Sequence, residues 1–297
     1  MTNLTSVRPS TLAWVHEHLA AGERIAEASV LHGGLTAEMR RLTIAAPDGS
    51  VRDLVLRTFV DRPDAADCLA RESDALTLLA TTAVPAPELI AVDPLAAHPS
   101  LLMTWMPGRT VLTDDGLAER IPVLAQQLVA IHAVQPVERP PAFVTLTTAD
   151  TVVTPPGANW SAAIDLIRRP HPPYEGRFLH RDYQPGNVLF EGTRLTAVVD
   201  WASTSWGPTD LDVAHCATNL ALLHGPTWAL SFVEAYEQAG GALSPDRHYW
   251  LVRDALSLSE DLPDAAQPWR DSTRPDLTPE TVAHRLDAYL TTLMTGG

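Results

Sequence analysis

The stretch FLHRDYQPGNVLF, residues 178–190, encloses a group of polar side chains between two apolar segments. The apolar ends predict two short buried strands, and the Pro-Gly pair at 185–186 predicts the turn that joins them. A turn requires no histidine, arginine, aspartate and asparagine around it. Loops that follow a buried strand commonly display catalytic side chains, so this segment predicts a catalytic loop.

Three oxygen-bearing side chains are expected to meet at this loop. Asp182 and Asn187 flank the turn, and Asp200 closes the next apolar strand, within 194–203. Carboxylate and amide oxygens are the ligands that hard cations such as Mg²⁺ prefer. The alternative is that Asp182 and Asn187 only cap the turn. A chance His-x-Asp-x4-Asn match is expected in roughly one such chain in a hundred, so the spacing favours a functional site.

The composition is typical of a globular chain without a membrane segment. The 297 residues are 45% hydrophobic and 19% charged, which is enough for a core in one large domain or two lobes. No apolar run approaches the ~18 residues that span a bilayer, and the first residues do not resemble a secretory signal. Cys68 and Cys216, far apart in sequence, are expected to be buried thiols. These features predict a cytoplasmic protein, monomeric or dimeric, with no membrane partner.

The net charge of −15 argues against a nucleic-acid partner, which requires a basic surface. It is compatible with a cationic small substrate, although acidic surfaces also serve solubility alone. The 21 basic residues are all arginines. The absence of lysine matters because phosphate-binding sites often use one.

The order of strand and helix signals divides the chain into two lobes. Residues 1–105 carry strand signals and one main helix, whereas residues 106–297 are mostly helical. The PDGS turn at 47–50 predicts a hairpin. Strands are predicted at 25–32, 38–46, 51–60 and 100–108, and helices at 10–20, 67–80, 116–134, 209–224, 226–239, 246–260 and 278–294. The fold class is thus α+β.

The sequence HRDYQPGN followed by VVDW resembles the catalytic loop and metal-binding aspartate of the protein-kinase-like fold. The PGN triplet at 185–187 and the DW pair at 200–201 are similar to its small-molecule branch, the aminoglycoside phosphotransferase family, with choline-kinase-like and macrolide-kinase-like relatives. The segment WGPTDLDVAH, 206–215, resembles the family's next block, in which Asp212, with Asp210 as its rival, would be a structural aspartate. The resemblance implies a two-lobed fold with an N-terminal antiparallel sheet and a mostly helical C-terminal lobe.

The resemblance also implies a role for each residue of the loop. Asp182 would accept the hydroxyl proton of an acceptor and align it for in-line attack on the γ-phosphate. Asn187 and Asp200 would hold Mg²⁺ against the phosphates of ATP or GTP. His180 would orient the loop by hydrogen bonds, and Arg181 is given no chemistry.

In the N-terminal lobe, the resemblance implies a nucleotide site. Arg57, the lone charge in the apolar strand 53–59, stands where protein kinases carry lysine, and Glu72 on the next helix would pair with it. The alternative is that Arg57 points outward from an edge strand. Gly33 and Gly34 would let backbone amides approach phosphate, although the full Gly-x-Gly-x-x-Gly pattern is absent. The backbone of the connection between the lobes would bind adenine: Thr104, Trp105 and Met106.

The acceptor pocket of the family is built from the segment before the catalytic loop and from C-terminal helices, here 136–175 and 246–276. The second range contains carboxylates that would suit a polyamine: Glu260, Asp261, Asp264 and Asp271. A solvated acidic loop is the alternative interpretation. The tryptophans of these regions would equally suit a macrolide or a quaternary amine.

The sequence therefore predicts an ATP- or GTP-dependent, Mg²⁺-dependent phosphotransferase that acts on a hydroxyl of a small molecule. The first hypothesis for the acceptor is an aminoglycoside-type antibiotic. The alternatives are a macrolide kinase, a metabolic kinase for choline, homoserine or a sugar, and a nucleotide-binding pseudokinase. The intact Asp182, Asn187 and Asp200 weigh against the pseudokinase.

Overall fold

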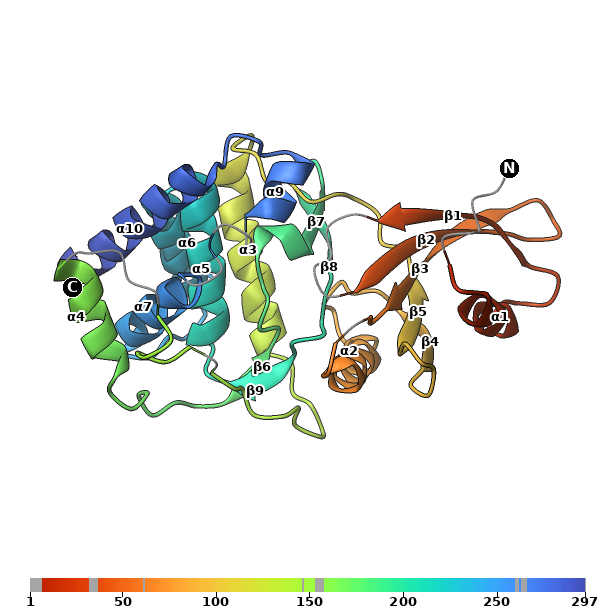
Figure 1. The fold of residues 1–297 in the computed structure, drawn as a ribbon, viewed down its shortest axis with the longest axis horizontal. Helices are drawn as coiled ribbons and strands as arrows, with labels where there is room; N and C mark the ends of the chain where they lie inside the picture. The colour runs from red at the N-terminus through yellow and green to blue at the C-terminus, as the bar shows by residue number, and fades with distance from the viewer. Residues whose placement is uncertain are drawn as a thin grey trace. The chain divides into compact units, whose positions relative to one another are not determined.

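The computed structural model describes residues 7–31, 37–60, 62–145, 147–152, 158–259, 262 and 266–296. The chain forms two compact units, Met1–Pro107 and Gly108–Gly297 (Figure 1). In the described part of the chain, the first unit contains a sheet and two helices, and the second is mostly helical. The predicted α+β class is therefore confirmed.

The first unit is built on a five-stranded antiparallel sheet in the order β1-β2-β3-β5-β4. Its strands are β1 (Arg24–Leu31), β2 (Glu38–Ala45), β3 (Val51–Thr58), β4 (Leu89–Asp93) and β5 (Ser100–Thr104), and its helices are α1 (Pro9–Glu17) and α2 (Ala65–Leu79). β2 and β3 form the predicted hairpin, in which Ala45 pairs with Val51. Gly49 in the turn has a φ of +86°, a conformation that glycine adopts without strain, so the glycine allows this tight turn to form.

The two faces of this sheet are covered by different helices. Neighbouring side chains along β3 point to opposite faces because a strand repeats every two residues. Leu54 and Leu56 are buried in an apolar cluster with Val15 of α1. Arg57 points to the other face and meets Glu72 of α2. β3 is therefore a central strand that is buried on both sides.

The second unit is mostly helical and contains two small sheets, β6-β9 and β7-β8. The strands are β6 (Arg177–Leu179), β7 (Val188–Glu191), β8 (Arg194–Val198) and β9 (Ser205–Gly207). The helices are α3 (Leu117–His132), α4 (Ala158–Ile167), α5 (Asp210–His224), α6 (Pro226–Gln238), α7 (Arg247–Ser257), α9 (Gln267–Ser272) and α10 (Pro279–Thr295). The five long helices predicted from periodicity correspond to α3, α5, α6, α7 and α10, whereas α4, α9 and β9 were not predicted.

Helix α5 lies at the centre of the second unit. Nearly all of its side chains are buried, and it contacts α6, α7 and α10 (Figure 1). Its polar side chains, such as Asp212 and Asn219, are therefore buried together with its apolar ones. Both cysteines are buried and unpaired, Cys216 in α5 and Cys68 in α2, as predicted. Within the described part of the chain, no helix is long and apolar enough to cross a membrane.

Candidate active site

The segment 178–190 folds as a strand, a loop and a second strand. β6 ends at Leu179, a 3₁₀ turn spans Pro185–Asn187, and β7 begins at Val188. Arg181 has a φ of +69°, in the left-handed region that residues other than glycine rarely adopt. Backbone strain of this kind costs about 1–3 kcal/mol and is concentrated at functional sites.

Asp212 holds the loop in this conformation. Its Oδ2 accepts a hydrogen bond from the backbone N–H of His180 (2.8 Å), and its Oδ1 accepts one from the N–H of Arg181 (2.7 Å). Burial would raise the pKa of Asp212, but the hydrogen bond and charge of His132 lower that pKa below its usual range, so the carboxylate is ionised. Asp210, the rival in the sequence, instead binds the segment that follows α6. Asp212 is thus the aspartate that supports the loop.

His180 connects the loop to the strand end that carries Asp200. Its ring is buried, Nδ1 accepts from the N–H of Asp182 (3.2 Å), and Nε2 donates to the carbonyl of Val199 (3.0 Å). Burial lowers the pKa of His180, which agrees with a neutral ring in this tautomer. The ring also packs on Trp201, with 4.3 Å between the ring centroids. His180 therefore fixes the positions of two strand ends relative to each other.

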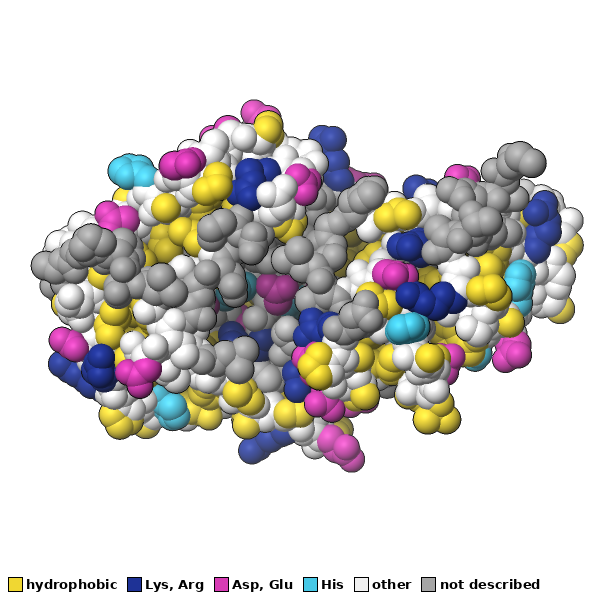
Figure 2. Space-filling view, in the orientation of Figure 1, with side chains coloured by type: hydrophobic (Ala, Val, Ile, Leu, Met, Phe, Trp, Pro, Cys, Tyr) yellow, Lys and Arg dark blue, Asp and Glu magenta, His cyan; other side chains and the backbone are white. Residues whose placement is uncertain are grey.

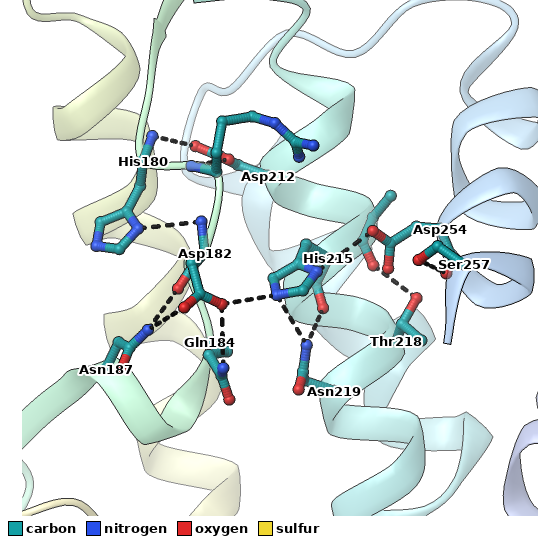
Figure 3. A network of polar contacts seen from close by, with 12 residues as sticks. His180, Asp182, Gln184, Asn187, Asp212, His215, Thr218, Asn219, Asp254 and Ser257 are labelled. Carbon is teal, nitrogen blue, oxygen red and sulfur yellow. Dashed lines mark hydrogen bonds and ion pairs between the residues drawn. The ribbon is translucent and has the colours of Figure 1, made fainter. Parts of the chain in front are cut away.

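Asp182 lies at the centre of a polar network (Figure 3). Its Oδ2 accepts a hydrogen bond from Nδ2 of Asn187 (2.9 Å), and its Oδ1 accepts from Nε2 of Gln184 (3.1 Å) and Nε2 of His215 (3.0 Å). The side chain is 33% exposed, so a ligand can reach it. Burial would raise the pKa of Asp182, but the hydrogen bond and charge of His215 lower that pKa below its usual range. The Asp182 carboxylate is therefore ionised at neutral pH.

Asn187 and Asp200 supply oxygen atoms that suit a cation. Nδ2 of Asn187 donates to the backbone carbonyl and to Oδ2 of Asp182, both at 2.9 Å, so Oδ1 is the atom of Asn187 that can bind a metal. The N–H of Val199 donates to the carbonyl of Asn187 (2.9 Å), which ties the end of the strand before Asp200 to the turn. Asp200 has a φ of +65°, a second left-handed residue.

This donor set fits Mg²⁺, which takes few protein ligands and completes its shell with water and phosphate oxygens. The described ranges contain no group of three or more His, Cys, Asp or Glu side chains arranged to hold a metal.

In the first unit, Arg57 and Glu72 form the ion pair that the sequence predicted. Nη1 of Arg57 lies 3.0 Å from Oε1 of Glu72, and the side chains are 3% and 1% exposed. The guanidinium lies over the ring of Phe59, 4.9 Å from its centroid. The alternative of an outward-pointing residue on an edge strand is wrong, because β3 lies between β2 and β5.

At the end of β5 and in the segment after it, some backbone N–H groups are already hydrogen-bonded within the first unit and are not available to a ligand. The N–H of Thr104 donates to the carbonyl of Glu88 (3.0 Å), and the N–H of Trp105 donates to the carbonyl of Asp53 (3.3 Å). Both donors are thus used within the first unit, so a base would have to bind through Met106 or through the carbonyl groups. Two further nucleotide candidates lie outside the described residues: Gly33 and Gly34.

Of the predicted acceptor residues, the structure describes only Asp271. Its carboxylate is exposed at the surface and accepts a hydrogen bond from Nε2 of Gln267 (2.6 Å). The others lie outside the described residues: Glu260, Asp261 and Asp264. Figure 2 shows that the acidic side chains of the described residues are scattered over the visible face and form no continuous patch there.

Gln184, His215 and Asp254 belong to the network around Asp182 and were not predicted from the sequence. Nε2 of His215, on α5, contacts Asp182, and its Nδ1 lies 3.3 Å from Oδ1 of Asp254 on α7. Burial acts to lower the pKa of His215, but the two carboxylates raise it to about 10, so the ring is an imidazolium at neutral pH. One feature of the sequence could have indicated His215. Asp212, His215 and Asn219 recur at spacings of three and four residues, which places them on one face of the helix.

A family model decides what kind of protein carries this loop. The model of the phosphotransferase enzyme family, APH, matches residues 27–251, which is more than half of the chain. The chain belongs to the APH phosphotransferase family. It is accordingly a small-molecule phosphotransferase, and the match includes the loop, the strand end at Asp200 and the Arg57–Glu72 pair.

Solved structures share the fold of this APH-family phosphotransferase. A thermostable mutant of aminoglycoside phosphotransferase APH(4)-Ia, in ternary complex with AMP-PNP and hygromycin B, is similar with a TM-score of 0.64 and 20% identity, over 98% of this chain and 100% of that chain. Aminoglycoside-3'-phosphotransferase of type VIII has a TM-score of 0.59 and 19% identity, over 82% and 97%. Macrolide 2'-phosphotransferase MphH from Brachybacterium faecium, an apoenzyme, has a TM-score of 0.57 and 18% identity, over 94% and 97%.

At these identities the likeness establishes the kinase-like fold of the APH-family chain. A search of curated proteins found no significant match to its sequence.

Proposed function

We propose that the chain transfers the γ-phosphate of ATP or GTP to a hydroxyl of a small molecule, with Asp182 as the catalytic residue. The observation that carries the proposal is the network around Asp182, in which an ionised, accessible carboxylate lies beside Asn187 and the strand end of Asp200. The family membership and the nucleotides named with the APH(4)-Ia structures support a nucleoside triphosphate as donor.

In this reaction Asp182 accepts the proton of the acceptor hydroxyl. The acceptor oxygen forms a bond to the γ-phosphorus, the bond from that phosphorus to the bridging oxygen breaks, and a nucleoside diphosphate leaves. Oδ1 of Asn187 and the carboxylate of Asp200 would hold Mg²⁺, which supplies neutralisation of the phosphate charge. His180 and Asp212 keep the three side chains in place through the backbone contacts described above.

Arg57 would bind the α- and β-phosphates in the position where protein kinases use lysine, and Glu72 would fix its direction. The planar guanidinium can bind two oxygens at once, whereas an ammonium is a point charge. Met106 and the carbonyl groups of the segment after β5 would bind the base.

A first prediction separates the structural role of this pair from its role with nucleotide. Glu72→Gln is expected to destabilise the fold by about 3–5 kcal/mol, because it removes the carboxylate that neutralises the buried guanidinium of Arg57. The double variant Arg57→Met and Glu72→Met should regain much of that stability and still lack nucleotide affinity. Denaturant unfolding and calorimetric titration with Mg²⁺·ATP measure the two properties.

The exposed pair Arg8–Glu38 offers a matched control. Glu38→Gln removes the same kind of partner at the surface and should change stability by no more than about 1 kcal/mol. Full nucleotide affinity in the stable double variant would remove Arg57 from the nucleotide site.

For the acceptor we propose an aminoglycoside-type antibiotic, with a macrolide or a metabolic hydroxyl compound such as choline, homoserine or a sugar as the alternatives. The net charge of −15 and the predicted carboxylates between 260 and 271 favour a polycation. The deciding experiment is a phosphate-transfer screen with ATP and GTP over hygromycin B, kanamycin, erythromycin, choline and homoserine. Transfer to none of these compounds, while nucleotide binds, would favour the pseudokinase.

A second prediction concerns salt. The affinity for a polycationic aminoglycoside is expected to fall steeply between low and high ionic strength, because salt screens each ammonium–carboxylate pair. Erythromycin, with one amine, should show a slight dependence, and a neutral sugar should show almost none. Calorimetric titrations of the active acceptor at several salt concentrations test this, and salt-independent binding of an aminoglycoside would contradict it.

A further inference from the structure

The Asp182 carboxylate has four lone-pair positions, and the residues that the structure describes use three of them. Oδ1 accepts from both Gln184 and His215, so its positions are filled. Oδ2 accepts from Nδ2 of Asn187 alone among the side chains of this network. The remaining position on Oδ2 is therefore the one that an acceptor hydroxyl can take.

His215 is held between two carboxylates that come from different parts of the chain (Figure 3). Its Nε2 donates to Asp182 in the loop after β6, and its Nδ1 donates to Asp254 on α7. Asn219, one turn later on α5, donates from Nδ2 to the backbone carbonyl of His215 (2.8 Å). The ring therefore has both nitrogens engaged, which leaves it a single orientation.

The second carboxylate is an unusual neighbour for a residue that serves only stability. The side chain of Asp254 is 10% exposed, and within the described residues its Oδ2 has no hydrogen-bond partner. A buried charge with so few partners costs free energy, and buried ion pairs are often replaceable by apolar side chains without loss of stability. A buried carboxylate that lowers stability in this way, and that lies next to the histidine bound to Asp182, points to a functional role.

We propose that His215, braced by Asp254, is a positioning residue that fixes the Asp182 carboxylate so that Oδ2 faces the acceptor hydroxyl. This inference rests on the proposed function, since it assigns the atom of Asp182 that receives the proton. The proton passes from the acceptor hydroxyl to Oδ2, while the oxygen–phosphorus bonds change as described above. His215 keeps its protons throughout and contacts neither the nucleotide nor the acceptor.

The test compares His215→Asn and Asp254→Asn with wild type. Each is expected to lower kcat by roughly 10- to 100-fold, the typical cost of a misplaced catalytic group, with the affinity for Mg²⁺·ATP unchanged. The double variant should be no slower than His215→Asn alone, because Asp254 acts through the ring. His215→Gln, which keeps a donor for Asp182, should recover part of the lost rate.

His224→Asn is the matched control, because His224 lies on the same helix and pairs with Asp114 at its far end. Its kcat should equal that of wild type. A purely structural role of His215 would lower the melting temperature and leave kcat per folded molecule intact, which would overturn the inference. Additive losses in the double variant would overturn the link through Asp254.

A measurement that needs no acceptor tests the positioning role of His215 separately from the proposed phosphotransferase function. Nitrogen-15 NMR of the isolated chain should show the His215 ring doubly protonated at pH 8, and Asp254→Asn should let it lose a proton at lower pH. A neutral ring at pH 8 in wild type would overturn the inference. An active wild type with unaffected variants refutes the positioning role alone, whereas a wild type that phosphorylates no compound of the panel refutes the proposed function and with it the assignment of Oδ2.

Discussion

Asp182→Asn is expected to lower kcat by roughly 10²–10⁴-fold, the usual contribution of a positioned base, while nucleotide binding persists. An amide has the size of the carboxylate but cannot take up the proton of the acceptor hydroxyl. The affinity for Mg²⁺·ATP should change little, because Arg57 and Asp200 are untouched. Steady-state kinetics with the active acceptor and calorimetry with nucleotide measure the two effects separately.

Asp287→Asn is a suitable control for this substitution. Asp287 is an exposed aspartate of α10 that accepts a hydrogen bond from Nε1 of Trp160 (2.8 Å), a bond that asparagine can also accept. Its kcat should match wild type. Normal turnover of Asp182→Asn with any acceptor would remove Asp182 from the mechanism, and a loss of nucleotide binding in that variant would point to a metal role instead.

Asp200→Ala is expected to abolish the Mg²⁺-dependent part of nucleotide binding. A lost metal ligand should weaken this binding by more than the ~10–100-fold that follows removal of an outer partner. Without the cation, the phosphate oxygens would also be repelled by the remaining carboxylate of Asp182. At a ligand concentration ~100 times the wild-type Kd, the variant should therefore lose about 2.7 kcal/mol of ligand-induced stabilisation.

A second substitution at Asp200 separates the loss of a metal ligand from strain in the backbone of that residue. Asp200 has a φ of +65°, which alanine tolerates less well than asparagine does. Asp200→Asn keeps one oxygen ligand and the backbone conformation, so its affinity should lie between those of wild type and Asp200→Ala. Identical titrations with and without Mg²⁺ in wild type and both variants would place the metal site elsewhere.

The parts of the site that lie within one local pattern could be predicted from the sequence. The loop at 178–190 carries its polar residues and its turn in a single stretch, and the charged Arg57 stands out in an apolar strand. The distance from Arg57 to Glu72 was predictable because a strand followed by a helix on its buried face brings such residues together. The hairpin at 47–50 followed from the turn residues alone.

The parts that depend on packing between distant helices could not be predicted in the same way. Asp212, His215 and Asn219 share one face of α5, but nothing in the sequence states that this face turns toward the loop, because the polar Asp210 lies on another face and nearly all side chains of the helix are buried. The contacts of His215 with Asp182 and Asp254 join a loop and two helices whose relative placement only the packed unit determines. β9 is three residues long and pairs with β6 far away in the chain, so it is too short for a periodic signal.

Having an arginine at the proposed nucleotide site, Arg57, also changes which reagents can label that site covalently. Protein kinases carry a lysine at this position, and the side-chain amine of a lysine can be acylated. A guanidinium remains protonated at any working pH and is a poor nucleophile, and the sequence contains no lysine to replace it. Covalent profiling based on amine acylation would therefore pass over this enzyme even when its nucleotide site is fully occupied.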